Sequence, residues 1–287
     1  MGTAKSVVLR VRVFVTKWVM TQDRIGTVWP TPNSVCATVA EVPAADYDLA
    51  ATGRAIAEPA RAAMLVRMMD GQAHTAGDLA EAAGISPSTA SPHLRHLIDA
   101  GLVIVTVAGR RRLHSLTSSE VAAAIEALAV VSPLLPVESL RQARTGSRLQ
   151  LARVCYSHLG GSLAVTLANE LVNAEVVEPL APGEVGVLRT LDHPLLAALS
   201  IADLSHGAGP TVRGCLDWTE RSAHLAGRLG SAVLSALLNL GWLTRRPRDR
   251  SLTLIETGAT RSAALGITPT DHAIPDTRRC AGARVAG

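Results

Sequence analysis

Two groups of side chains in the first half of the chain have the chemistry needed to bind nucleic acid. The first group is a run of hydroxyl, imidazole and guanidinium side chains: Ser86, Ser88, Thr89, Ser91, His93, Arg95 and His96. The second is the run of consecutive arginines Arg110, Arg111 and Arg112, directly after a glycine. Hydroxyl groups bond phosphates or base edges, and an arginine can bond guanine through two donors. Clustered arginines also attract a phosphate backbone or the floor of a minor groove.

A third group, in the second half, has the chemistry of a metal site. Cys155 and His158 are three positions apart, and Cys215 and His224 follow later, with Asp217 between them. Thiolate and imidazole are the donors that a divalent transition metal such as Zn²⁺ takes in tetrahedral sites. We expect Cys155 and His158 to share one face of a helix. The alternative is that these residues pack in a core or line a small-molecule pocket, because buried cysteines are usually core residues.

The elements around the first two groups have clear sequence signals. A helix with apolar residues at three- and four-residue spacing ends near Gly71, and a second runs from Thr75 to Gly84. A third begins at Ser86 and ends near Gly101. Two short helices joined by a glycine-containing turn predict a helix-turn-helix. Residues 102–117 then predict a β-hairpin with the arginines at its tip, followed by a helix to about residue 131.

The residues in this stretch resemble those of the ArsR/SmtB family of bacterial repressors. The resemblance runs from Ile56-Ala-Glu-Pro-Ala-Arg61 through residues 79–91 to His93-Leu-Arg-His-Leu-Ile-Asp-Ala-Gly-Leu102, within residues 46–131. It implies a dimer whose outer helices pack together, a recognition helix in each major groove, and repression relieved by an effector. Pro92 departs from a regular recognition helix, because it removes a backbone donor.

The two metal sites that are familiar in that family are missing from the sequence. Residues 75–83 contain no cysteine, and residues 119–131 contain no histidine. The Cys/His group of the second half could form a different metal site.

Composition sets the broad class of protein. The 287 residues are 48% hydrophobic, 18% charged and only 2% aromatic, which favours two modest domains with helical, Ala- and Leu-rich cores. Residues 46–131 hold seven Lys and Arg against nine Asp and Glu, a net charge of −2, so DNA binding must depend on where the cations lie. The four widely spaced cysteines favour a reducing cytoplasm over a disulfide framework, and no apolar run is long enough to predict membrane insertion.

We therefore expect a mainly α protein with small β-hairpins, in five segments. These are an extension that is disordered or precedes the native start (1–45), a winged helix-turn-helix domain (46–131), a linker (132–146), a mainly helical dimerisation or effector domain (147–270), and a disordered tail (271–287). Helical segments are predicted at about 147–160 and 185–189. A long helix predicted at 221–240, followed by an arginine-rich hairpin, suggests a degenerate second winged helix. Its arginines could touch DNA or lie in solvent: Arg245, Arg246, Arg248 and Arg250.

The predicted function is sequence-specific DNA binding by a homodimeric transcriptional repressor whose effector is a small molecule or a metal. The partners are a double-stranded operator and a second copy of the chain. One alternative is a metal-responsive repressor that uses the Cys/His group, and another is an interaction scaffold whose winged helix no longer binds DNA. An enzyme is not expected, because the sequence has no glycine-rich phosphate loop with lysine, no nucleophile elbow and no paired-histidine metalloprotease motif.

Overall fold

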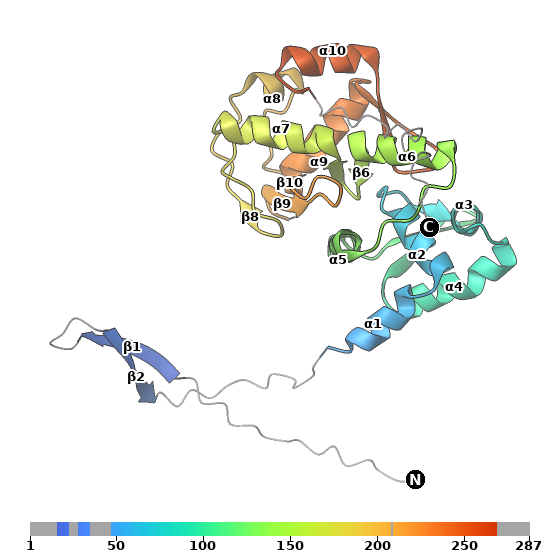
Figure 1. Cartoon of the computed structure of the whole chain (residues 1–287), viewed down its shortest axis with the longest axis horizontal. Coiled ribbons are helices and arrows are strands. Elements are labelled where there is room, and N and C mark those ends of the chain that lie inside the picture. The colour runs from blue at the N-terminus through green and yellow to red at the C-terminus, as the bar shows by residue number, and fades with distance from the viewer. Residues whose placement is uncertain (1–15, 23–27, 35–46, 208, 269–287) are drawn as a thin grey trace, which may run out of the picture. The chain divides into compact units, whose positions relative to one another are not determined.

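The computed structural model describes residues 16–22, 28–34, 47–207 and 209–268. Residues 1–49 and 50–287 form two separate compact units. In the first unit, β1 (Thr16–Gln22) and β2 (Val28–Ser34) pair as an antiparallel hairpin (Figure 1). The rest of the predicted extension and the predicted tail 271–287 lie outside the described residues.

The second unit begins with a winged helix (Figure 1). Helices α2 (Pro59–Met68), α3 (Ala76–Ala83) and α4 (Pro87–Asp99) enclose a core that includes Met64 and Leu97. Strands β3 (His74–Thr75), β5 (Arg111–Leu116) and β4 (Val103–Ala108) form an antiparallel sheet in that order. Helix α1 (Leu49–Ile56) precedes these elements and α5 (Ser119–Val131) follows them, as the sequence predicts for residues 119–131.

Local hydrogen bonds explain where the two central helices begin and end. The Thr75 hydroxyl accepts from the backbone N–H of Asp78, whose carboxylate accepts from the N–H of Thr75, so α3 begins with a capping box. It ends at Gly84, which has a φ of 66° that glycine adopts without strain. Ser86 caps α4 by accepting from the N–H of Thr89. The predicted helix-turn-helix boundaries are confirmed.

The C-terminal part of this unit contains two repeats of a hairpin followed by a helix. The first repeat comprises β6 (Arg153–Cys155), β7 (His158–Gly160) and α7 (Ser162–Asn173). The second comprises β9 (Val212–Leu216), β10 (Ala223–Ala226) and α9 (Gly227–Asn239). Each helix packs against the hairpin of its own repeat and also across to the other, α9 against β7 and α7 against β10, so these exchanged contacts hold the two hairpins together.

The remaining elements surround these repeats (Figure 1). They are α6 (Leu140–Leu151), β8 (Val185–Gly186), which pairs with β9, α8 (Pro194–Ala198), the hairpin of β11 (Leu243–Arg245) with β12 (Leu252–Leu254), and α10 (Glu256–Ala264). The core they share is built from leucine and valine and includes Leu171 and Leu229. No helix among the described residues is long and apolar enough to span a membrane.

Several elements predicted for this part are wrong. The helix predicted from residue 147 to 160 is the end of α6 followed by the hairpin β6–β7. The predicted helix at 221–240 begins with strand β10, the predicted helical turn at 185–189 contains strand β8, and α6 begins inside the predicted linker. Strands of two to four residues are too short to show a two-residue period, so the apolar residues around them fit a helix equally well.

Arginines of the β11–β12 hairpin join the C-terminal part to the winged helix. Arg245 donates to the carbonyl of Asp70 at 3.0 Å, and Arg250 hydrogen-bonds the buried carboxylate of Glu126 on α5. In return, Arg67 donates to the carbonyl of Pro247 at 3.0 Å. The sequence left open whether Arg245 and Arg250 touch DNA or lie in solvent, and in the structure both side chains hydrogen-bond the winged helix.

A backbone contact adds to this junction. The turn of β6–β7 reaches the end of α2, where the N–H of Tyr156 donates to the carbonyl of Met69 at 2.7 Å. Gly71 has a φ of 69°, and a Cβ at this position would lie 1.9 Å from the carbonyl oxygen of Tyr156. Only a residue without a side chain allows this close approach.

Candidate DNA interface and Cys/His cluster

Helix α4 buries one face and exposes the polar face that the sequence predicts. Ala90, Leu94 and Leu97 lie in the core. The other face exposes six of the seven candidate residues: Ser86, Ser88, Thr89, Ser91, Arg95 and His96. Pro92 lies on the same exposed side, early in the helix.

Five of the candidate residues have local partners. The Ser86 hydroxyl lies 2.8 Å from that of Ser88 and 2.9 Å from that of Thr89, in addition to its capping bond, and the Ser91 hydroxyl donates to the carbonyl of Pro87 at 3.2 Å. His93 is partly buried, with its Nδ1 3.5 Å from the carboxylate of Glu58 at the start of α2. Ser86, as the cap, and His93 therefore hold the helix in place, and the exposed guanidinium of Arg95 is better placed to contact a ligand.

The hairpin β4–β5, which we call the wing, carries the three arginines at its tip. Gly109 and Arg110 form the turn, and Arg111 and Arg112 pair with Ala108 and Val107 in the register of the strands. All three arginine side chains are exposed. Since successive residues of a strand point to opposite faces, Arg111 and Arg112 project from opposite sides of the wing.

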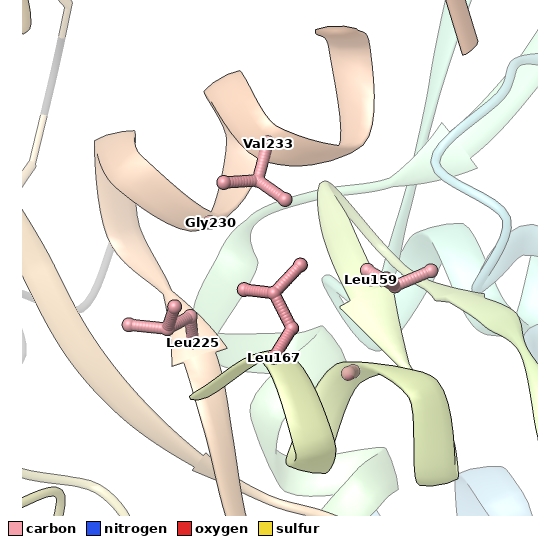
Figure 2. Close-up of a pocket in the computed structure, with 6 residues that line it drawn as sticks. Leu159, Leu167, Leu225, Gly230 and Val233 are labelled. Atoms are coloured by element: carbon pink, nitrogen blue, oxygen red, sulfur yellow. The ribbon is translucent and has the colours of Figure 1, made fainter. Parts of the chain in front are cut away.

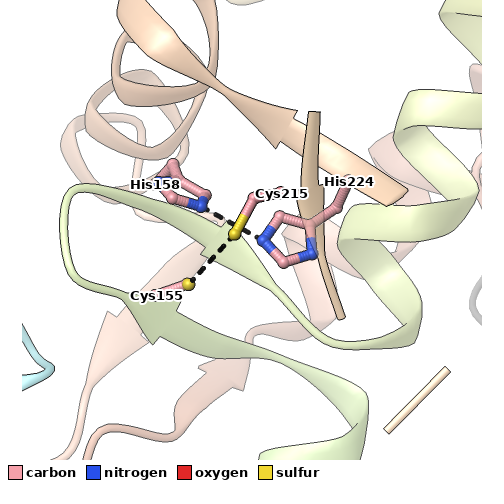
Figure 3. Close-up of side chains that lie close together, drawn as sticks. All are labelled: Cys155, His158, Cys215 and His224. Atoms are coloured by element: carbon pink, nitrogen blue, oxygen red, sulfur yellow. Dashed lines mark hydrogen bonds between the residues drawn. The ribbon is translucent and has the colours of Figure 1, made fainter. Parts of the chain in front are cut away.

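The four candidate metal ligands meet in the C-terminal part (Figure 3). The Cys155 and Cys215 sulfurs are 3.9 Å apart, and the Nε2 atoms of His158 and His224 are 3.1 Å apart. All four donor atoms lie within 4.8 Å of one another. We call these residues the Cys/His cluster. The expectation that Cys155 and His158 share a helix face is wrong, because they are direct cross-strand partners in β6–β7.

The two repeats supply this cluster symmetrically. Cys215 and His224 are cross-strand partners in β9–β10, just as Cys155 and His158 are in β6–β7. In each repeat an arginine stands two residues before the cysteine, a leucine follows the histidine, and a glycine with positive φ follows three residues after it. This repeated pattern is the sequence signal that could have predicted that the Cys155/His158 pair lies close to the Cys215/His224 pair.

Buried charged groups support the cluster. Asp217 is fully buried, with Oδ2 3.1 Å from His224 Nδ1 and 3.0 Å from the Arg153 guanidinium. The same oxygen accepts from the N–H of Gly161 at 2.7 Å. Arg153 in turn lies 3.9 Å from Glu126 on α5. Sequence reasoning missed Arg153 and Glu126, because their partners are far away along the chain.

These contacts shift the pKa values of the cluster. The Cys215 thiol and burial together raise the pKa of Cys155 to about 12. Burial alone would lower the pKa of His224, but its contacts with Asp217 and Cys155 outweigh burial and raise the pKa to about 9. Burial would raise the pKa of Asp217, yet His224 and Arg153 hold it far below its usual range. The cluster therefore carries protons at neutral pH that a bound cation would have to displace.

The cluster borders a large pocket. Its volume is about 860 Å³, and its wall includes Cys155, His158 and Cys215 together with Ala122 and Glu126 of α5. A second cavity nearby is lined by Leu159, Leu167, Leu225 and Val233 among others (Figure 2). Its volume of about 10 Å³ is too small, and its lining too apolar, to hold a ligand.

Comparisons with known proteins agree with this architecture. Residues 56–106 match the family model described as a helix-turn-helix domain. The chain is 34% identical over 220 residues to the uncharacterized HTH-type transcriptional regulator YdfF of Bacillus subtilis, a match that covers 71% of this chain and 90% of the relative. It is 40% identical over 83 residues to the HTH-type transcriptional regulator CmtR of Mycobacterium tuberculosis, covering 29% of this chain and 70% of that protein.

Two solved structures are similar to about a third of the chain. The NMR structure of the cadmium metal-sensor CMTR from Mycobacterium tuberculosis is 35% identical, covers 32% of this chain and 94% of that chain, and has a TM-score of 0.27. The homodimeric winged helix-turn-helix DNA-binding domain of Mb0332 from Mycobacterium bovis is 26% identical. This match covers 31% of this chain and 88% of that chain, and its TM-score is also 0.27. The match to YdfF, which is much longer than the winged helix, extends into the C-terminal part.

Proposed function

Because the chain belongs to the family of helix-turn-helix transcriptional regulators of the ArsR type, and is a DNA-binding regulator, we propose that it acts as a homodimeric repressor of a specific operator. One observation supports this proposal most directly. Helix α4 exposes hydroxyl and guanidinium groups on the face opposite its buried Ala90 and Leu97, next in the chain to a wing tipped with arginines. That is the arrangement in which a recognition helix reads a major groove while the wing holds the backbone.

The contacts divide by chemistry. Arg95 carries the only guanidinium on α4, so it is the residue suited to bond guanine through two donors. Ser88, Thr89, Ser91 and His96 serve as shorter donors and acceptors to bases or phosphates. The three wing arginines neutralise phosphates and set the salt dependence. In this proposal His93 and Ser86 position α4 rather than contact DNA.

An exposed apolar strip supports self-association. The end of α5 and the segment after it expose Val131, Leu134, Leu135 and Val137, and Leu134 and Leu135 are 81% and 88% exposed. Contiguous apolar surface of this kind marks an interaction site. A second copy of the chain, using the same strip about a two-fold axis, would cover it and place two α4 helices on a palindromic operator.

The test is an anisotropy titration of the purified chain against DNA from upstream of its own gene, at two salt concentrations. We expect a specific Kd on the order of 10⁻⁸–10⁻¹¹ M and a strong loss of affinity with salt. Arg95→Ala should cost about 1–3 kcal/mol of discrimination against shuffled DNA. Arg144→Ala, an exposed arginine on α6, is the matched control and should change nothing.

The outcomes separate repression from the scaffold alternative. If operator and shuffled DNA bind equally weakly at both salt concentrations, the winged helix does not read sequence and the proposal fails. If binding is specific, a promoter–reporter assay must show lower expression in the presence of the chain. Higher expression would make it an activator and refute repression.

A further inference from the structure

Two donor–donor distances in the Cys/His cluster match those of a tetrahedral metal site, and all four donor atoms lie within 4.8 Å of one another. Zn²⁺ bound to cysteine sulfur at about 2.3 Å and histidine nitrogen at about 2.05 Å places the two sulfurs about 3.8 Å apart and the two nitrogens about 3.3 Å apart. The corresponding distances here are 3.9 Å between the sulfurs and 3.1 Å between the nitrogens. A disulfide would bring the sulfurs to about 2.05 Å, so the two cysteines are not bonded. We infer that Cys155, His158, Cys215 and His224 together bind one Zn²⁺-type ion.

The histidines are oriented to donate nitrogen lone pairs. The Nε2 atoms of His158 and His224 face each other (Figure 3). A proton on one of them could make a hydrogen bond between the two rings, but it would leave the two cysteine sulfurs without a shared partner. Asp217 lies 3.1 Å from the other ring nitrogen of His224, on the side away from the cluster. A carboxylate at this position keeps the proton on Nδ1 and leaves Nε2 free to bind metal, an arrangement that recurs around zinc-bound histidines.

The hairpins explain why these four donors meet at all. Each hairpin places one cysteine directly opposite one histidine, and the exchanged packing of α7 and α9 brings the hairpins together. Apolar packing alone gives no reason for four polar donors to converge in a buried position. Cys155, His158 and His224 are each less than a tenth exposed, and such groups are costly to bury without a shared partner.

The donor set and its surroundings define the kind of ion and its route of entry. Two thiolates and two imidazoles favour Zn²⁺ and similar thiophilic cations over Mg²⁺ or Ca²⁺. Four protein donors fill a tetrahedral shell, so the ion has a structural or regulatory role and leaves no open position for catalysis. Cys215 is partly exposed and lines the large pocket, which gives the ion a path into the site.

Cobalt provides a spectroscopic test in the full-length chain. Reduced, metal-free protein is titrated with Co²⁺, and the d–d bands and the thiolate-to-cobalt charge-transfer band are recorded. We expect intense bands of a tetrahedral site with two thiolates, saturation at one Co²⁺ per chain, and loss of the bands when Zn²⁺ displaces Co²⁺. A wild-type spectrum without thiolate charge transfer, or one typical of six oxygen or nitrogen ligands, overturns the proposal.

Variants test the individual ligands. Cys215→Ser, at the partly exposed position, should remove about half of the charge-transfer intensity and weaken Co²⁺ binding at least about 100-fold, beyond the range expected for a residue that only supports a ligand. The matched control is His206→Gln, at a histidine that lines the same pocket. This variant should bind Co²⁺ as the wild type does.

Two further results bear on the proposal. If Cys215→Ser does not fold, Cys215→His replaces sulfur by another metal donor, and a Co²⁺ complex with one thiolate band supports the site. Unchanged binding and spectrum in either Cys215 variant overturn the proposal. A Cys155–Cys215 disulfide in the purified chain that persists in the presence of reductant and excess Zn²⁺ overturns it as well.

Discussion

Glu126 is a buried carboxylate at the junction between the winged helix and the C-terminal part, and Glu126→Gln tests what its charge contributes. Its side chain is 2% exposed, hydrogen-bonded to Arg250 and 3.9 Å from Arg153. Glutamine keeps the shape and one acceptor but removes the charge. Arg153 keeps Asp217 as a partner at 3.0 Å, whereas Arg250 retains only the carbonyl of Val154 at 3.4 Å.

The loss of stability in Glu126→Gln therefore comes mainly from Arg250, whose buried guanidinium loses its charged partner. Removing one partner of a buried ion pair costs about 3–5 kcal/mol, and the acceptor that glutamine retains places the expected cost near the lower end, about 3 kcal/mol. With an m-value of about 3 kcal/mol/M, this cost lowers the urea midpoint by about 1 M. Glu120→Gln, on the exposed side of the same helix, is the matched control and should leave the midpoint almost unchanged, because water screens its charge.

The dependence on pH has a definite sign. Burial raises the pKa of Glu126, but Arg250 and Arg153 outweigh burial and hold the pKa below the ordinary value of 4.5. A carboxylate with a lowered folded-state pKa contributes stability above its unfolded pKa and loses it as the pH falls through the folded value. The difference in free energy of unfolding between wild type and Glu126→Gln should therefore be at its full value at neutral pH and become smaller below pH 4.5. A difference below about 1 kcal/mol at neutral pH, or one that grows as the pH falls, refutes the reasoning.

Three other outcomes follow from the same structure. Replacing Arg110 and Arg112 with alanine should weaken binding to all DNA sequences alike and reduce the log–log salt slope by about 1 for each phosphate that is no longer neutralised; an unchanged slope would remove the wing from the interface. Leu135→Asp should shift the chain from dimer to monomer in sedimentation, whereas Val185→Asp, at another exposed apolar residue on β8, should not. Asp217→Asn should weaken Co²⁺ binding about 10–100-fold and keep the thiolate bands, and disappearance of those bands would show that the hairpins themselves had come apart.

The winged helix could be predicted from sequence because its signals are local. The capping pair Thr75 and Asp78, the glycine that ends α3 and the serine that begins α4 each fix a boundary through contacts within a few residues. The exposed face of α4 follows from the same helical period. His93 is the exception, since its partner Glu58 lies on a different helix and no local pattern reveals it.

The C-terminal part could not be predicted to the same depth, because its chemistry depends on distant contacts. The sequence predicts Cys155 and His158 on one helix, whereas they lie on β6 and β7, because strands this short have no recognisable two-residue period. Cys155 and Cys215 are 60 residues apart in the sequence, and they come together only because their two hairpins pack side by side. Likewise, the sequence does not show that Arg245 donates to the carbonyl of Asp70, just after α2, or that Arg250 binds Glu126 on α5.

Gly71 limits how the two parts could have been joined during evolution. A winged helix that stands alone can end its helix with any residue that tolerates a left-handed backbone, at a cost of about 1 kcal/mol for alanine. Here the carbonyl of Tyr156 occupies the space that a side chain at position 71 would need. The winged helix must therefore have glycine at this position for the C-terminal part to pack against it. A graft of this C-terminal part onto another winged helix should therefore succeed only where the acceptor domain has glycine at this position.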